Sequence, residues 1–149
     1  MTELKDLYQE IILDHNKNPR NYGKLSDHTH KAEGFNPMCG DHYSIYLKIK
    51  NDRIIDVTFE GAGCAISKSS ASMMTATLKG KTVEEAKKMF DKFQNMMTGD
   101  NPCEEVPEEI CKVEPLQGVK KFPTRIKCAT LIWHTMNNAL KGENKSSTE

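Results

Sequence analysis

The sequence lacks the features that would assign it to a membrane, secreted or nucleic-acid-binding class. It has no apolar run near the roughly 20 residues that a membrane-spanning helix needs, and its first residues carry acids without the apolar segment of a secretory signal. It has no charge excess, because 21 basic residues balance 21 acidic ones, whereas proteins that neutralise nucleic-acid phosphates usually carry a basic surplus. We therefore expect a cytoplasmic protein without a membrane or nucleic-acid partner.

Closely paired cysteines are also absent, although the chain of 149 residues contains five cysteines. An odd number of cysteines in a reducing compartment argues against a disulfide framework and favours metal binding or thiol chemistry. Cys103 and Cys111 could form a disulfide with each other, but we favour the interpretation that they are incidental. The glycines before Cys64 lack the third glycine of a dinucleotide-binding fingerprint.

The spacing of hydrophobic residues predicts an α+β fold. Strict alternation from Tyr43 to Ile49, followed by an Asn51-Asp52 turn and a second apolar run from Ile54, indicates two paired strands. Residues 29–36 would add an edge strand. Because the connections are too short for crossover helices, we expect a three-stranded antiparallel sheet with helices packed on one face. The helices are expected at 3–15, about 65–78, after the capping box Thr82-Val-Glu-Glu85, and about 125–140.

The length suits a single domain, which we assign to residues 1–141. Within it, four of the six prolines fall at residues 102–123, and six acids occur within the 15 residues 100–114, which contain one base. We interpret residues 100–123, approximately, as an acidic insertion. Residues 142–149 are polar and are expected to form a flexible tail.

Four residues at the edges of the predicted elements form the candidate site. Cys39 and Asp41 are two residues apart, so their side chains share one face of an extended backbone. Cys64 precedes one predicted helix and Cys128 lies in the predicted first turn of another, where the helix dipole favours a thiolate. Three thiolates and one carboxylate would suit a tetrahedral Zn²⁺ ion. The alternative is that the three cysteines are unrelated core thiols, because their spacing matches no close-paired metal motif.

The segments around these cysteines carry a family resemblance. They are Asn36–Asp41, Phe59–Ser67 with Ser70–Met74, and Arg125–Trp133, together with Ile11–Asn21 at the end of the first helix. With these motifs in this order, residues 4–141 resemble the U-type iron–sulfur cluster assembly proteins.

This family has two relevant branches, and the residue before the third cysteine distinguishes them. The IscU branch, a scaffold for a [2Fe–2S] cluster, typically has a histidine there, whereas this chain has Lys127, whose ammonium group is a poor ligand. The SufU branch has a lysine there and an insertion between the second and third cysteines. Both features are present here, so the sequence resembles SufU more closely.

The resemblance to SufU implies a zinc-dependent sulfurtransferase that works with a SufS-type cysteine desulfurase. It implies Zn²⁺ ligands at Cys39, Asp41, Cys64 and Cys128, with Cys39 as the persulfide acceptor and Arg125 in a supporting role. The sulfur would pass to downstream iron–sulfur assembly proteins. The alternatives are a scaffold that binds a [2Fe–2S] cluster through the same ligands and, less favoured, a structural zinc module.

Overall fold

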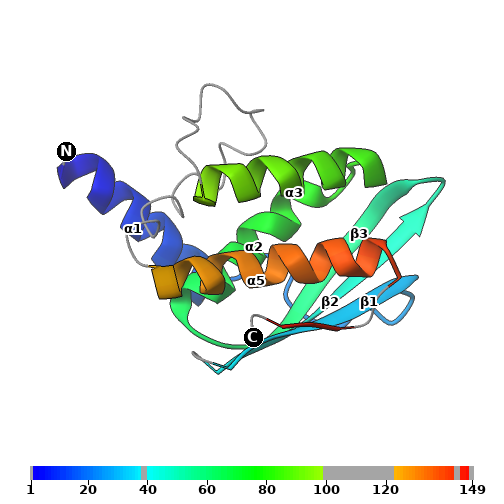
Figure 1. Ribbon diagram of the computed structural model, residues 1–149, viewed down its shortest axis with the longest axis horizontal. Coiled ribbons are helices and arrows are strands. Elements are labelled where there is room, and N and C mark those ends of the chain that lie inside the picture. The colour runs from blue at the N-terminus through cyan, green and yellow to red at the C-terminus, as the bar shows by residue number, and fades with distance from the viewer. Residues whose placement is uncertain (1, 38–39, 99–122, 143–144, 148–149) are drawn as a thin grey trace.

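The fold has two layers, a β-sheet and a set of helices that cover one face of it (Figure 1). The computed structural model describes residues 2–37, 40–98, 123–142 and 145–147, and describes side chains for residues 10–37, 40–97 and 126–142. The elements are α1 (Thr2–Lys17), β1 (His30–Asn36), β2 (Asp41–Lys50), β3 (Arg53–Ala62), α2 (Ala65–Leu78), α3 (Val83–Thr98), α5 (Pro123–Leu140) and β4 (Lys145–Ser147). The antiparallel pairing of β1, β2 and β3 confirms the predicted fold class.

The β2–β3 hairpin follows directly from its sequence. Asn51 and Asp52 have φ values of 53° and 61°, the left-handed pair that a two-residue hairpin turn with the correct twist requires. A register shift follows Lys48, so that Ile54 is buried while Ile55 is 40% exposed. Ile55 is the residue in phase with buried Val57 and Phe59, so the bulge explains why Ile54 rather than Ile55 belongs to the core.

The tail after α5 differs from the prediction. Lys145–Ser147 form β4, which pairs in parallel with Glu33–Phe35 of β1 and gives the strand order β3-β2-β1-β4. The sequence predicted a flexible tail and placed residues 29–36 at the edge of the sheet. A polar segment of three residues has no alternation to identify it as a strand, and β1 supplies its hydrogen-bonding partner.

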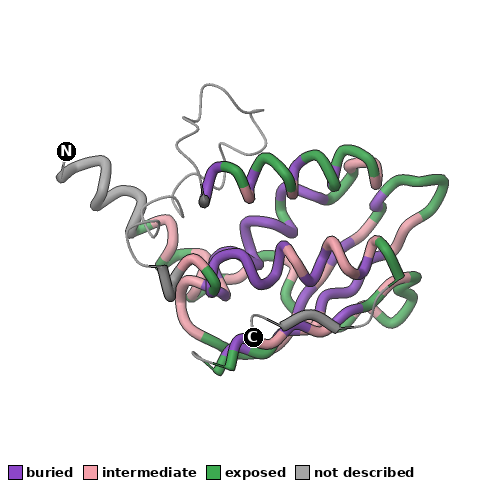
Figure 2. The backbone as a smooth tube through the Cα atoms, viewed as in Figure 1, coloured by how far each residue is buried: buried purple, intermediate pink, exposed green. Residues whose placement is uncertain are grey.

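The core lies between the sheet and helices α2 and α5, where buried residues concentrate (Figure 2). Tyr43, Ile45 and Leu47 of β2 are fully buried. Helix α3 joins the core through Phe93, whose ring stacks on Trp133 of α5 with centroids 4.2 Å apart. None of the described helices is both long and apolar enough to cross a membrane.

The helix termini agree with the sequence except at α5. The Thr82 amide donates to Glu85 Oε1 at 3.0 Å and the Glu85 amide donates to Thr82 Oγ1 at 3.1 Å, which confirms the capping box. Helix α5 begins at Pro123 rather than near Arg125, because proline suits the first position of a helix. The predicted insertion at 100–123, including Cys103 and Cys111, lies outside the described residues except for Pro123.

Candidate metal centre

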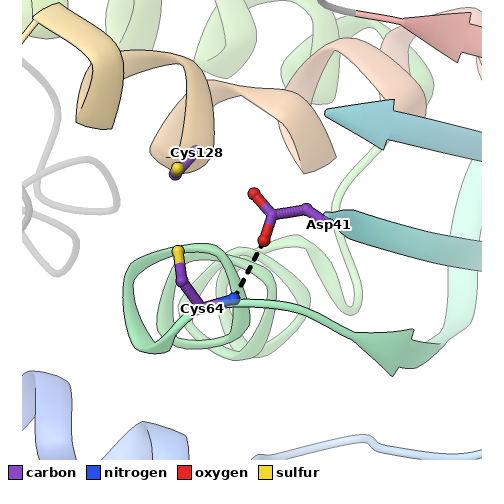
Figure 3. Close-up of side chains that lie close together, drawn as sticks. All are labelled: Asp41, Cys64 and Cys128. Carbon is purple, nitrogen blue, oxygen red and sulfur yellow. Dashed lines mark hydrogen bonds between the residues drawn. The ribbon is translucent and has the colours of Figure 1, made fainter. Parts of the chain in front are cut away.

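Three of the four predicted ligands meet at one end of the sheet (Figure 3). Asp41 is the first residue of β2, Cys64 is the N-cap of α2, and Cys128 lies in α5. One ligand atom from each residue can be chosen so that all of them lie within 4.8 Å of one another. The fold thus gathers residues that are up to 87 positions apart in the chain (128 minus 41).

The carboxylate of Asp41 is buried and held at both oxygens. Its Oδ1 accepts a hydrogen bond from the Cys64 amide at 2.9 Å and lies 3.1 Å from the Ser67 hydroxyl. Its Oδ2 accepts from Asn36 Nδ2 at 3.1 Å. A buried carboxylate needs such donors, because burial without them strongly disfavours its charged form.

Cys64 begins α2 and caps it. Its sulfur accepts from the backbone amide of Ser67 at 3.5 Å, so the thiol takes the part that a serine or aspartate oxygen usually plays at an N-cap. The positive end of the helix dipole favours a thiolate at this position. Gly63 permits the arrangement, since a Cβ there would collide with Asp41 Oδ1 and lie 2.7 Å from Ser67 Oγ.

Cys128 is fully buried, unlike Cys64. Because α5 begins at Pro123, Cys128 is beyond the first helical turn in which the sequence placed it. The dipole of α5 therefore favours its thiolate less than expected, since that effect falls off within one turn. Instead, Asn36 Nδ2 donates to Cys128 Sγ at 3.4 Å.

A hydroxyl chain supports the carboxylate from the core side. Tyr43 and Ser67 place their hydroxyl oxygens 3.0 Å apart, and Ser67 in turn reaches Asp41. Burial, as the main cause, raises the pKa of Tyr43 well above its ordinary value, which keeps the phenol protonated. Tyr43 can therefore donate to Ser67 while Ser67 donates to Asp41.

The donor set fits a zinc ion. Two sulfurs and one carboxylate oxygen are ligands that Zn²⁺ commonly accepts. Around a tetrahedral zinc, neighbouring ligand atoms are roughly 3.5–3.8 Å apart, so the present separations of up to 4.8 Å need only a small contraction. Three residues leave one tetrahedral position for a fourth ligand.

The other predicted site residues are placed as follows. Cys39 lies outside the described residues, as does the side chain of Arg125. His42, which follows Asp41 and is not a predicted ligand, is exposed on the opposite side of β2, and its Nε2 lies 3.7 Å from Glu33 Oε1.

Sequence reasoning missed two residues that contact the ligands. Asn36 and Ser67 are 0% and 1% exposed, and both hydrogen-bond to Asp41. Only the hairpin register could have suggested Asn36, because it pairs across the hairpin with Asp41. Ser67 stands at the third helical position after Cys64, where an N-cap side chain finds its backbone partner.

Comparison with known proteins relates the whole chain to iron–sulfur cluster assembly. The zinc-dependent sulfurtransferase SufU of Bacillus subtilis is 44% identical over 140 residues, covering 94% of this chain and 93% of that protein. The iron–sulfur cluster assembly scaffold protein IscU of Streptococcus pyogenes is 42% identical over 142 residues, covering 95% of this chain and 87% of that protein.

A solved structure agrees with these relatives in fold and sequence. It is described as a candidate iron–sulfur cluster assembly scaffold protein for the SUF system from Fervidobacterium islandicum, with a TM-score of 0.80 and 39% identity, covering 88% of this chain and 94% of that one. Residues 7–129 match the NifU-like N terminal domain. The chain therefore belongs to the NifU-like N-terminal domain family, within its IscU- and SufU-like iron–sulfur cluster assembly proteins.

Proposed function

We propose that this protein is a zinc-dependent sulfurtransferase, which takes persulfide sulfur from a SufS-type cysteine desulfurase and passes it to downstream iron–sulfur assembly proteins. The observation that carries the proposal is the convergence of Asp41, Cys64 and Cys128 within 4.8 Å. It is supported by the identity of 44% to a protein named for this activity. We assign the activity to the cytoplasm, where free thiols persist.

The proposed zinc ligands are Cys39, Asp41, Cys64 and Cys128. Bound Zn²⁺ would keep the cysteines ionised and protect them from unwanted reactions. The chain itself prepares the site, since buried donors already neutralise part of the charge on Asp41. Arg125 lies three positions before Cys128 in α5, and we propose a supporting role for its positive charge.

Accessibility favours Cys39 as the thiol that receives sulfur. Cys128 is fully buried and cannot meet a partner protein, and Cys64 is half-buried and engaged as a helix cap. The residues on either side of the Met38-Cys39 pair, Pro37 and Gly40, are both exposed. A sulfur donor must reach its acceptor directly, so a position flanked by exposed residues suits this role.

The proposed reaction is a thiol exchange. The Cys39 thiolate attacks the terminal sulfur of the desulfurase persulfide, forming a new S–S bond on Cys39. The S–S bond of the donor breaks, and the desulfurase cysteine leaves as a thiolate. Because one S–S bond replaces another, the step consumes no oxidant or reductant.

Sulfide release from L-cysteine by the desulfurase, under reductant, tests the proposal. We expect the zinc-loaded protein to stimulate release strongly and Cys39→Ser to abolish the stimulation. Cys111→Ser is the matched control, because it removes a thiol from the same chain and should leave the stimulation intact. Absence of stimulation by the wild-type protein would reject the sulfurtransferase proposal.

A cluster scaffold is the second candidate function. The relative from Streptococcus pyogenes, named as a scaffold, is nearly as similar as the SufU relative. Against this candidate, the position where IscU proteins typically carry histidine is Lys127, whose side chain is exposed beside buried Cys128. Anaerobic reconstitution that gave a stable [2Fe–2S] cluster, transferable to an apo-acceptor, would favour the scaffold.

A further inference from the structure

Asn36 occupies a position that connects two of the candidate ligands. It is the last residue of β1 and pairs directly with Asp41, the first residue of β2. Directly paired residues in antiparallel strands point their side chains to the same face. Asn36 and Asp41 are 0% and 2% exposed, and the face they share is covered by α5, from which Cys128 approaches.

The side-chain amide of Asn36 contacts both ligands at once. Its Nδ2 lies 3.1 Å from Asp41 Oδ2 and 3.4 Å from Cys128 Sγ. Since an amide nitrogen carries two hydrogens and a carboxylate only accepts, the nitrogen can serve both partners together. The same chemistry fixes the orientation of the amide. In the flipped orientation, the Asn36 oxygen, which only accepts, would face a carboxylate oxygen and a sulfur.

The hydrogen bonds of Asn36 reduce electrostatic repulsion between the candidate ligands. Without a metal, one carboxylate and two thiols lie within 4.8 Å of one another, and the ionised forms required for metal binding repel each other. Donors between them reduce that repulsion and maintain the spacing. The Cys64 amide does so on the Oδ1 side of Asp41, and Asn36 does so between Asp41 and Cys128.

We infer that Asn36 is a positioning residue, which holds Asp41 and Cys128 at ligand spacing before the metal arrives. The inference rests on the part of the proposed function that places a metal ion at these ligands. Removing a group that orients metal ligands typically weakens metal binding by about 10- to 100-fold. Through the same contact, Asn36 also joins the end of β1 to α5.

Two variants of Asn36 and one control test the inference in the full-length protein. Asn36→Ala removes both donated bonds, and Asn36→Val removes them while keeping a larger side chain that strands accommodate well. Ser70→Ala is the matched control, since Ser70 is equally buried and links α2 to α5 through the Ala129 carbonyl and the Trp133 indole, without contacting a ligand.

The readouts are the zinc dissociation constant, measured against a chromogenic chelator, and the absorption spectrum of the Co²⁺-loaded protein. We expect both Asn36 variants to bind zinc about 10- to 100-fold more weakly and to shift the Co²⁺ bands. Ser70→Ala should lower the thermal midpoint of the metal-free protein but bind zinc like the wild type.

A purely structural role for Asn36 predicts a different pattern. The thermal midpoint of the metal-free variants would fall, while zinc affinity and the Co²⁺ spectrum stayed at wild-type values, and that result would overturn the inference. The outcome is separable from the proposed function. A wild-type protein that binds zinc through Asn36-supported ligands, yet leaves the desulfurase unchanged, would reject the sulfurtransferase and keep the inference.

Discussion

The two ends of the β-sheet are held together by different kinds of contact. One end holds the candidate ligands Asp41, Cys64 and Cys128 and is called the metal end. Hydrogen bonds there join β1, β2, α2 and α5, as in the contact between Asn36 and Cys128. At the far end, the Asn51-Asp52 turn and the Thr82-Glu85 capping box join residues that are close in sequence. The turn and the cap at the far end each form from local contacts, and backbone bonds such as that from the Val83 amide to the Asp52 carbonyl at 2.8 Å join the two. At the metal end, by contrast, the polar contacts that join the candidate ligands form only between elements that the whole fold brings together.

The comparison shows that the polar groups around the candidate site are buried, whereas those at the far end lie near solvent. Asn36, Asp41 and Ser67 are all buried at the metal end, where each requires partners to offset the loss of hydration. At the far end, Thr82 and Glu85 make comparable bonds near solvent. Substitutions at the metal end should therefore lower the free energy of unfolding more than substitutions at the far end. Only those at the metal end should affect zinc binding.

The largest expected contrast is between two glycines with positive φ, Gly61 at the metal end and Gly80 at the far end. A Cβ at Gly61 would collide with the His42 carbonyl, whereas one at Gly80 would meet nothing within 4 Å. We expect Gly61→Ala to lower the free energy of unfolding by about 3 kcal/mol or more. Gly80→Ala should cost about 1–2 kcal/mol, from backbone strain alone. Urea denaturation of both variants measures the difference, and equal costs would contradict the contrast.

Ser67→Ala should have the next largest effect. It leaves the buried Tyr43 hydroxyl without its Ser67 partner and removes a donor to Asp41, which should lower the free energy of unfolding by about 1–3 kcal/mol. Zinc affinity should fall as well. Thr77→Ala, in the last turn of the same helix, removes only a bond to the Met73 carbonyl and should leave zinc affinity unchanged. A zinc titration of both variants decides whether Ser67 contributes to the site.

Thr82→Ala tests the far end alone. Loss of the N-cap should lower the free energy of unfolding by about 1 kcal/mol, with wild-type zinc affinity. Hydrogen bonds with Thr82 lower the pKa of Glu85 below its ordinary value of 4.5. That carboxylate stabilises the folded state at neutral pH, and the contribution is lost as the pH falls through 4.5 toward the lowered pKa. Thr82→Ala keeps the backbone amide that donates to Glu85, so only the smaller part of the pKa shift, from the Thr82 hydroxyl, is lost. Urea midpoints of wild type and Thr82→Ala should draw only partly together in acid, and complete convergence would contradict this.

The smallest effect is expected midway along α2, where His15 of α1 contacts Ser72. His15 Nδ1 lies 2.7 Å from Ser72 Oγ, and burial, aided by Arg20 and opposed by Asp14, lowers the pKa of His15 from 6.5. The unfolded chain therefore takes up a proton first, so stability falls as the pH drops through 6.5. His15→Gln should reduce this slope in pH-dependent urea denaturation. Some slope should remain, because burial also lowers the pKa of His134.

The sequence predicts the far end well because the signals there are local. The turn residues, the capping box and the alternation of β2 each act within a few positions. The exceptions need tertiary partners. Polar β4 is a strand only because β1 lies beside it, and the bulge at Ile55 appears only when β3 pairs with β2.

The residues of the candidate site also divide into those that the sequence identifies and those that only the folded structure reveals. Asp41, Cys64 and Cys128 could be selected from their residue types and flanking motifs, and the structure brings them together. Whether they bind zinc with Cys39 stays a prediction. Asn36 and Ser67 are not selected in this way, although both lie within the family motifs, because asparagine at a strand end and serine in a helix carry little chemical signal until the fold buries them beside a carboxylate.

The most direct test of the account is to follow sulfur from L-cysteine labelled with ³⁵S through the desulfurase and into this protein. After the reaction, peptide mapping without reductant would locate the label in the zinc-loaded chain. The account predicts label on the peptide containing Cys39, and none on this chain in Cys39→Ser. Label elsewhere in the chain, or its undiminished uptake by Cys39→Ser, would contradict the assignment of Cys39 as the sulfur acceptor.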